Sequence, residues 1–463
     1  MLNNEALYVM AEQVNALKTV KIYGKISAVK GIVIEAVGVA DFVSVGTRAF
    51  VYSVNNTKKI MCEVVGFDEG AVLLMSFGEV DGIGIGSKVE ILSDANIICP
   101  DPSWLGRVIN SLGEPIDGKG PLRVGDKEYP IKNAPPPSQK RNKLGSKIDL
   151  GVKVIDTFAS CCYGQRMGIF AGSGVGKSIL ISMLTRYANT DVKIIGLVGE
   201  RSREVKEFID EYLGQEGLEK AIIIVSTGDE PALLRRRAAY VTMAVAEYFR
   251  DQGKEVLCII DSITRFAMAQ REIGLAVGEP PTSKGYTPSV FSELPKLLER
   301  AGPGIGQGNI TGLFTVLVEG DDHNEPISDA ARGILDGHIV LDRAIAQRGR
   351  FPAVDVLQSV SRAVPKCNDD FENKLINFGR KMLATYNDMA EMIRLGAYKK
   401  GSDPDVDASM GYFTKLEEFF SQKPEESKHI LDSYRQLAEI LNISEENNEE
   451  SKDFDQAQEA QHQ

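Results

Sequence analysis

Apolar residues recur with several different spacings along the chain, and each spacing predicts a different kind of segment. In residues 1–18, Leu7, Met10, Val14 and Leu17 lie three or four positions apart, which predicts a short helix with one apolar stripe. Such a stripe either packs the helix on its own domain or docks a partner. We therefore predict an N-terminal helix over 1–18 and leave both roles, packing and docking, open.

Residues 19–95 contain short Val- and Ile-rich runs that are broken by Gly and Asn. Five runs of four or five residues stand out: 20–23, 31–35, 48–52, 62–65 and 71–75. Short strands at this spacing predict a small β-barrel or a β-sandwich.

Between about residue 145 and residue 365, apolar runs alternate with helical spacings. Several of six runs are nearly continuous in apolar residues, as expected of a parallel sheet covered on both faces: 167–170, 192–198, 221–225, 256–260, 313–318 and 338–341. Helical segments, notably Pro231–Gln252, separate most of them. This alternation predicts an α/β nucleotide-binding core with a parallel sheet, and residues 96–145, which include the prolines at 135–137, form the linker that leads into it.

After residue 366 the spacing becomes helical. One face is formed by Leu375, Phe378, Met382, Tyr386, Met389 and Ile393, and a second helical stretch covers Glu426–Leu441. We predict a helical domain over 366–443. Residues 444–463 are polar and acidic with almost no apolar side chains, which predicts a disordered tail.

Composition narrows the class of protein. The 463 residues carry 53 Lys and Arg against 65 Asp and Glu, a net charge of −12, which argues against nonspecific binding along nucleic acid. No apolar run approaches the roughly 18 residues that span a bilayer, and the first residues lack the layout of a signal peptide. Six dispersed cysteines without a Cys-x-x-Cys pair indicate free thiols in a reducing cytoplasm.

The strongest chemical signal follows the apolar run at 167–170. It consists of Ala171, Gly172, Ser173, Gly174, Val175, Gly176, Lys177 and Ser178, before an apolar helical stretch. The glycines let successive backbone N–H groups face one anion, the lysine reaches β- and γ-phosphates, and the serine hydroxyl can ligate Mg²⁺. The usual pattern has Gly where this chain has Ala171. An incidental Lys-Ser after a glycine-rich turn is the alternative, but the flanking strand and helix favour a phosphate-binding loop.

Hydrolysis of a bound triphosphate needs further groups. Asp261 ends the apolar run at 256–260 and can hold Mg²⁺ through a water ligand. Glu200 follows another buried run. There it can orient the attacking water, or it can form an ion pair with Arg201 or Arg203, and the sequence pattern favours neither role over the other.

Neutralising the negative charge that develops during phosphoryl transfer needs an arginine. Arg362 near the end of the core is a candidate, but its spacing alone does not distinguish it from the other arginines of the chain. The basic run Arg235–Arg237 lies in a helical stretch, which favours a solvated or interface face over a catalytic one.

Together these segments resemble a known family. The stretches 171–178, 199–204, 258–267 and 358–362 resemble rotary-type ATPases related to the catalytic subunit of ATP synthase, and 278–302 and 318–326 are similar to the flagellum-specific protein-export ATPases. The sequence Ile393–Tyr398, followed by Asp403-Pro-Asp, resembles the flagellar rather than the virulence branch. The resemblance covers roughly residues 20–440.

The resemblance implies both fold and roles. The expected fold is an α/β phosphate-loop core behind a small β-barrel (19–95), with a C-terminal helical domain. Lys177 and Ser178 would bind phosphate and Mg²⁺, Glu200 would orient water, and Asp261 would support the metal. Arg362 would act as an arginine finger in the neighbouring subunit's site. Phe351 falls where many relatives carry a Tyr that stacks on adenine, and the ring that stacks is kept.

The resemblance also implies partners and a location. It implies a homohexamer in the cytoplasm, peripheral at the inner face of the membrane near the export gate. A stator-like regulator would dock on the N-terminal helix, a coiled-coil stalk would occupy the centre, and export substrates with their chaperones would meet the C-terminal domain. No nucleic acid is expected.

Three functions stay in view. The first is a Mg²⁺-dependent ATPase that energises flagellar protein export, with virulence-type secretion as its near alternative. The second is a hexameric RNA translocase, which the acidic chain and the few aromatic residues among basic ones in 19–93 disfavour. The third is a non-catalytic nucleotide-binding ring subunit, which Glu200 disfavours.

Overall fold

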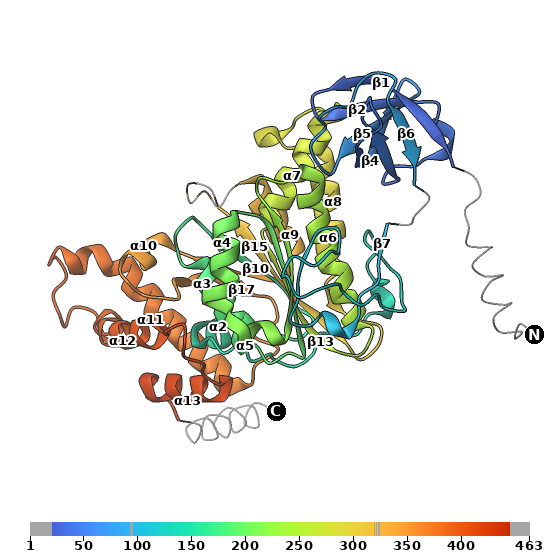
Figure 1. Ribbon diagram of the computed structural model, residues 1–463. Helices are drawn as coiled ribbons and strands as arrows, with labels where there is room; N and C mark the ends of the chain where they lie inside the picture. The colour runs from blue at the N-terminus through green and yellow to red at the C-terminus, as the bar shows by residue number, and fades with distance from the viewer. Residues whose placement is uncertain (1–20, 93–95, 319, 321, 323–324, 445–463) are drawn as a thin grey trace, which may run out of the picture.

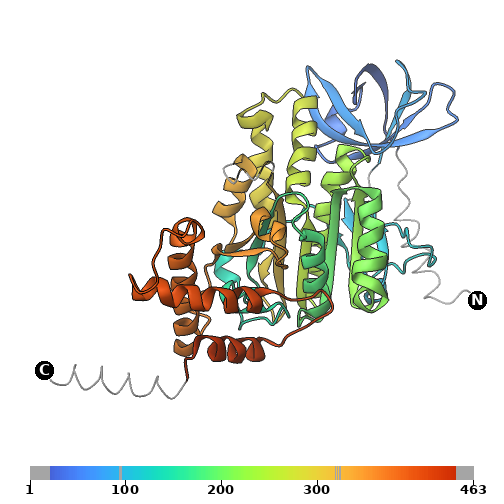
Figure 2. The ribbon, with the colours of Figure 1, turned by 90° about the vertical axis from the view of Figure 1, so that its left-hand side faces the viewer.

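The computed structural model describes residues 21–92, 96–318, 320, 322 and 325–444, and it contains a β-barrel, a sheet domain and a helical domain (Figure 1). The barrel and the helical domain lie at opposite ends of the sheet domain, as the side view also shows (Figure 2). The predicted helix over 1–18 and the predicted tail beyond Ser444 lie outside the described residues. Among those described, no helix is both long and apolar enough to cross a membrane.

The first domain is a closed barrel of six antiparallel strands in the order β1-β2-β5-β4-β3-β6. The strands are β1 (Tyr23–Lys30), β2 (Val33–Val37), β3 (Arg48–Tyr52), β4 (Lys59–Asp68), β5 (Ala71–Ser76) and β6 (Lys88–Ile91). Alternate residues such as Ile34, Val64 and Leu74 are buried inside it. The structure thus selects the barrel over the sandwich. It corrects the first predicted run, because β1 begins at Tyr23, and adds β6, whose short Lys-Val-Glu-Ile sequence carries little strand signal.

The central domain is built on a sheet of order β17-β16-β10-β15-β13-β11-β12-β8, with a short β14 beside β15. Its strands are β8 (Val108–Asn110), β10 (Arg166–Ala171), β11 (Val192–Glu200), β12 (Ala221–Thr227), β13 (Glu255–Asp261), β14 (Gly302–Pro303), β15 (Asn309–Leu317), β16 (Gly337–Leu341) and β17 (Val354–Ser361). The strands along the main path are parallel except β17, which runs antiparallel to β16. All six predicted core strands are confirmed.

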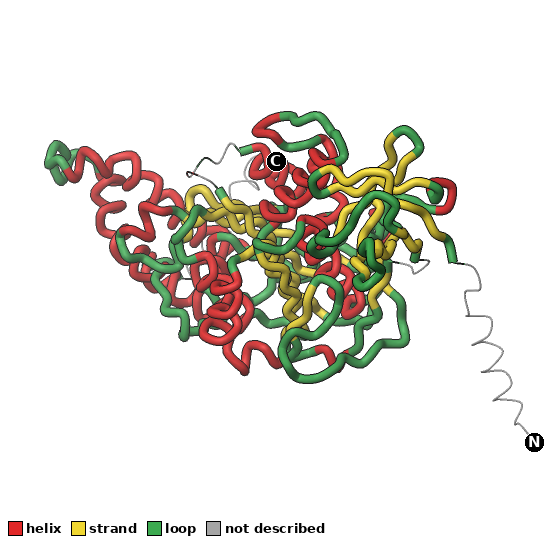
Figure 3. Tube along the Cα trace, turned by 45° about the horizontal axis from the view of Figure 1, so that its top comes forward, coloured by secondary structure: helices red, strands yellow, loops and turns green. Residues whose placement is uncertain are grey.

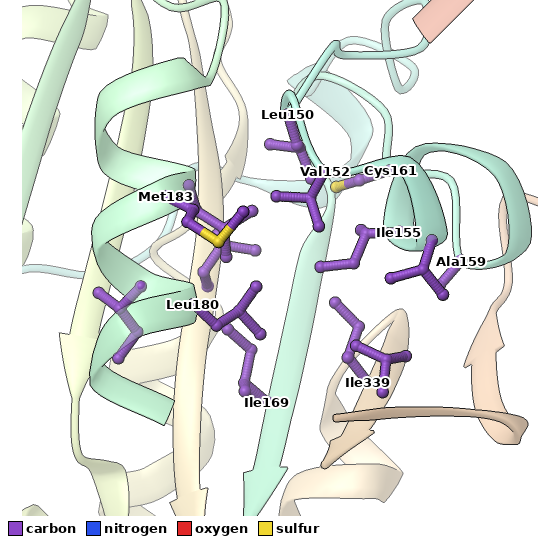
Figure 4. Close-up of a cluster of buried hydrophobic side chains, with 14 of the residues drawn as sticks. Leu150, Val152, Ile155, Ala159, Cys161, Ile169, Leu180, Met183 and Ile339 are labelled. Carbon is purple, nitrogen blue, oxygen red and sulfur yellow. The ribbon is translucent and has the colours of Figure 1, made fainter. Parts of the chain in front are cut away.

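Helices cover both faces of this sheet (Figure 3). One buried cluster unites α3 (Lys177–Tyr187) with residues such as Ile169 and Ile195, and Figure 4 shows Leu180 and Met183 of α3 beside Ile169 and the segment 150–161. A second cluster on the other face contains Phe170 and Ile194, one position away from those residues. It also contains residues of α6 (Ala232–Arg250), α7 (Ile263–Ala276), α8 (Pro288–Leu298) and α9 (Pro326–Ile334). Burial on both faces explains the continuous apolar runs.

The barrel is fastened to the sheet domain by α6. Arg236 and Arg237 are 8% and 5% exposed, and Arg236 Nη2 lies 2.7 Å from Glu63 Oε1 on β4. Arg237 Nε donates to the backbone oxygen of Ser111 at 2.9 Å. The sequence left two roles open for these arginines, a solvated face or an interface. The solvated face is wrong for Arg236 and Arg237, which lie instead at an interface between two domains of the same chain.

The C-terminal domain contains three longer helices, α11 (Asp370–Arg394), α12 (Pro404–Phe420) and α13 (Ile430–Leu441), which pack with α2 (Lys153–Phe158). The predicted face of α11 is buried at Leu375 and Met382 but largely not near Ile393, because the far end of the helix extends away from the sheet domain (Figure 1). Helix α12 was not predicted. Its buried residues Val406, Ser409, Leu416 and Phe420 nevertheless fall at helical spacing, so the sequence carried a signal for this helix.

Candidate functional site

The loop at 171–178 joins the end of β10 to the start of α3. Gly174 and Gly176 have φ of 76° and 87°, a left-handed conformation that glycine adopts without strain. Lys177 is the first residue of α3, so the free N–H groups and the positive end of the helix dipole face the loop. The loop therefore has the conformation of an anion cradle, as the sequence predicts.

Two carboxylates lie beside Lys177. Its ammonium nitrogen hydrogen-bonds Asp261 Oδ1 at the end of β13 and lies 3.3 Å from Glu200 Oε1 at the end of β11. Thr315 Oγ1 on β15 donates to the same Asp261 oxygen at 2.6 Å. Three adjacent parallel strands thus deliver these groups to one edge of the sheet, where ligands bind in such folds. The ion pair of Glu200 is with Lys177, whereas Arg201 lies 3.6 Å from Glu204.

Burial and neighbouring charges shift the pKa values of Glu200 and Lys177. Burial first and the nearby Asp261 carboxylate second raise the pKa of Glu200, Lys177 opposes them, and the net result is a pKa of about 7. Burial lowers the pKa of Lys177, but the carboxylates of Asp261 and Glu200 outweigh it and leave the pKa raised. Lys177 is therefore cationic at neutral pH, and Glu200 titrates near the working pH of an enzyme.

Phe351 lies next to the phosphate-binding loop although it is 175 positions away in the sequence. A Cβ atom added at Gly176 would lie 3.2 Å from Cδ1 of the Phe351 ring. The ring is 40% exposed and lines a cavity of about 720 Å³ together with Ala171, Lys177, Ser178 and Glu200. A cavity of this size suits a nucleotide, and an aromatic ring at its rim suits a base.

Sequence reasoning missed several cavity-lining residues. Arg201, Glu204, Arg265 and Arg343 also line the cavity. Glu204 hydrogen-bonds Glu200 and contributes to its raised pKa. A signal for Arg265 existed, since it lies four positions after Asp261, in the first turn of α7. Arg343 follows β16 and carried no such signal.

Oxygen donors dominate the candidate metal position. Ser178 supplies a hydroxyl at the cavity, and Asp261 supplies a buried carboxylate behind it. Hard oxygen ligands of this kind suit Mg²⁺, which is held in phosphate-transfer sites by few protein ligands and by the phosphates themselves. The residues present therefore fit the predicted metal.

Arg362 lies at the other end of the sheet. Its backbone N–H donates to the Asp336 carbonyl at 2.9 Å, and the Asp336 carboxylate accepts hydrogen bonds from Arg166, the first residue of β10. Lys177 lies beyond the last residue of the same strand, so the six residues of β10 separate the two by about 15–20 Å. An arginine side chain cannot cover that distance, and the chain does not bring Arg362 to its own phosphate-binding loop.

Comparison with known families agrees with each domain. The ATP synthase alpha/beta family matches through its nucleotide-binding domain over residues 151–361 and through its β-barrel domain over 26–92. Residues 372–439 match the T3SS EscN ATPase C-terminal domain.

Curated relatives match over nearly the full length. The chain is 53% identical to the flagellum-specific ATP synthase of Caulobacter vibrioides, covering 92% of this chain and 98% of that one. The corresponding protein of Bacillus subtilis is 46% identical, with 91% and 95% covered. The chain belongs to the flagellum-specific ATP synthase family. Members of this family are ATPases of type III protein export, and the relatives favour the flagellar branch over the virulence branch.

Solved structures of family relatives have the same three-domain fold. The assembled ATPase EscN of the enteropathogenic E. coli type III secretion system is 39% identical, with a TM-score of 0.85 and coverage of 90% of this chain and all of that one. EscN in complex with its central stalk EscO is 38% identical over the same shares, with a TM-score of 0.81. The family fold predicted from the sequence is confirmed.

Proposed function

We propose that this export ATPase hydrolyses Mg²⁺-bound ATP at the boundary between neighbouring copies of the chain, in a homohexameric ring. One observation carries the proposal: the phosphate-binding loop and the candidate arginine finger lie at opposite ends of β10. A closed ring repeats one head-to-tail interface, in which two different faces of the chain meet. Such an interface can combine the loop of one copy with Arg362 of the next.

The loop half of the site binds and orients the substrate. The backbone N–H groups of 172–178 hold the phosphates, Lys177 contacts the β- and γ-phosphates, and Phe351 stacks on the adenine. The side chain of Lys177 is already held in position by Asp261 and Glu200, so little conformational entropy is lost when phosphate oxygens arrive.

Glu200 polarises the attacking water, because its carboxylate stands beside Lys177 at the cavity wall and titrates near neutral pH. Ser178 and Asp261 hold Mg²⁺, which when bound neutralises charge on the phosphates. Arg362 of the adjacent copy stabilises the negative charge that develops on the transferred phosphoryl group.

The solved relatives support the proposed assembly and one of the proposed partners. EscN has been solved assembled and with its central stalk EscO, which supports a ring with a coiled-coil stalk for this chain. We extend the proposal to a stator-like regulator at the N-terminal segment, to export substrates and chaperones at the helical domain, and to the export gate at the membrane. The ring would then work in the cytoplasm, peripheral to the inner face of the membrane.

The test is a subunit-mixing experiment. Lys177→Ala removes the loop half of the site, and Arg362→Ala removes the finger half. Each variant alone should be inactive. In a random 1:1 mixed ring, about one quarter of the interfaces join an intact loop to an intact finger, so turnover should return to about that fraction. Mixed rings that stay as inactive as their parents would reject a site shared between copies.

A further inference from the structure

Gln165 lies in the turn before β10 and is completely buried. Its amide oxygen accepts a hydrogen bond from the backbone N–H of Cys162 at 2.9 Å, which fixes the orientation of the side chain in the turn. A buried amide of this kind is costly unless both its oxygen and its nitrogen are bonded. The contacts of its nitrogen therefore determine what the residue holds in place.

The amide nitrogen holds the base of Arg362 from two sides. Gln165 Nε2 donates to the Asp336 carbonyl at 3.1 Å and to Ser361 Oγ at 3.0 Å. Ser361 precedes Arg362 in the chain, and the Asp336 carbonyl is the same oxygen that accepts the Arg362 backbone N–H at 2.9 Å. The Gln165 side chain thus contacts both the carbonyl that anchors the Arg362 backbone and the side chain of the residue before Arg362.

The Arg362 side chain itself is weakly held. It is exposed, and its guanidinium group donates a hydrogen bond from Nη2 to the Arg332 carbonyl at 3.2 Å. Its aim therefore depends on where the backbone at 361–362 is held. A misplacement of about 1 Å at a catalytic group can cost on the order of a hundredfold in rate.

We propose that Gln165 is a positioning residue that aims Arg362 into the active site of the neighbouring copy. The inference rests on the proposed function, in which Arg362 acts in trans. The same side chain also lies at the start of β10, the strand that carries the chain's own phosphate-binding loop. Two effects of a substitution must therefore be separated, one on the neighbour's site and one on its own.

Gln165→Met removes the amide while nearly keeping the volume. We expect turnover to fall about 10- to 100-fold while the affinity of the chain for ATP stays within about twofold. Ser361→Ala removes a single attachment and should lower turnover less, by several-fold. Gln270→Met is the matched control: Gln270 is also a buried glutamine with bonded side-chain atoms, but it lies on α7 next to the barrel and should leave turnover within about twofold.

Mixing separates the two effects. Gln165→Met copies are mixed 1:1 with Lys177→Ala copies, which have an intact Gln165 and Arg362 but a disabled loop. If Gln165 acts through the finger, the loops of Gln165→Met copies are completed by good fingers, and turnover should recover to about one quarter of wild type. The 1:1 mixture of Arg362→Ala with Lys177→Ala copies is measured in parallel, as the reference for a lost finger.

Each outcome decides. Recovery in both mixtures supports the proposal. Recovery with Arg362→Ala but not with Gln165→Met overturns the role of Gln165 and leaves the proposed function intact. Recovery in neither overturns the site shared between copies. If Gln165→Met fails to bind ATP or to assemble, Ser361→Ala is measured alone in its place. A several-fold fall in kcat with ATP affinity within about twofold supports the inference, and normal turnover or an equal loss of ATP affinity overturns it.

Discussion

The two ends of β10 carry cations in opposite circumstances. At its carboxyl end, the Lys177 side chain is 11% exposed and faces two carboxylates of its own chain. At its amino end, Arg362 is exposed, and its guanidinium hydrogen-bonds a backbone carbonyl. The first cation is neutralised within the chain, and the second can find its anion in a neighbour. In the proposed function these two cations belong to two unlike halves of one site, and the difference teaches how each half is held.

This contrast has a physical basis in desolvation. A buried ammonium without a partner costs several kcal/mol, so a lysine placed at a cavity wall needs acids around it. An exposed guanidinium keeps its water, needs no acid, and stays available for phosphate oxygens, which it binds in bidentate fashion. The Lys177 side of the proposed site is thus neutralised within the chain, whereas Arg362 would gain an anionic partner only on the proposed assembly.

The largest effect is expected when the neutralised cation is removed. Lys177→Ala deletes the phosphate contact and leaves the buried acids Asp261 and Glu200 facing each other, so ATP turnover should fall at least about 1,000-fold and ATP affinity should fall with it. Phosphate-release kinetics measure the turnover, and ATP titration measures the affinity. Lys127→Ala, at an exposed lysine of the linker, is the control that should change neither.

Removal of the exposed cation should separate turnover from binding. Arg362→Ala should lower kcat about 100- to 1,000-fold with ATP affinity within about threefold, because the arginine acts on charge that develops during the reaction. Arg362→Lys should recover little, since a lysine lacks the planar fork. Arg435→Ala on the surface of α13 serves as the control. A large loss of ATP affinity in Arg362→Ala would mean that the residue belongs to the loop half.

Phe351 tests the adenine side of the loop half. Phe351→Ala removes the ring beside Gly176 and should raise the KM for ATP about tenfold, in line with stacking of about 1–2 kcal/mol per base. Phe351→Tyr keeps the ring and should leave KM within about twofold. Phe42, an exposed aromatic of the barrel, gives the control variant Phe42→Ala. Equal KM values for Phe351→Ala and wild type would remove the ring from the nucleotide site.

The loop half of the site was predictable from sequence, and its local character is the reason. Gly174, Gly176 and Lys177 follow one another in the chain, so the turn, the helix start and the anion cradle are determined by neighbours. Asp261 was predictable because a buried strand that ends in a carboxylate must present it at the sheet edge. Such features depend on few long-range contacts.

The finger half was not predictable to the same degree. The place of Arg362 depends on β17 running antiparallel to β16, a pairing that joins residues about 24 positions apart at one end, such as Gly337 and Ser361. Spacing alone therefore made Arg362 one arginine of many, and a family resemblance had to single it out. Gln165 was missed for the same reason, since its contacts at Asp336 and Ser361 are 171 and 196 positions away.

The smallest expected effect concerns the charge balance around Lys177. The pKa of Glu200 in the folded chain is raised to about 7 from its ordinary value of 4.5, so between these values the folded state binds more protons than the unfolded state. The free energy of unfolding must then fall as pH rises from about 4.5 to about 7 and level off above it. After allowance for the coupling to Lys177 and Asp261, the Glu200 contribution between pH 5.5 and pH 8 is about 1–2 kcal/mol.

Glu200→Gln isolates that contribution, because an amide of the same shape does not titrate. Urea unfolding at pH 5.5, 7 and 8 should show that the variant loses about 1–2 kcal/mol less stability over this range than wild type. Glu219→Gln, at an exposed position of α5 (Gly214–Glu219), should follow the wild-type curve. Parallel curves for wild type and Glu200→Gln would mean that Glu200 is charged throughout. The acids around Lys177 would then carry more negative charge than one lysine neutralises, and the loop half would be less self-contained than its geometry indicates.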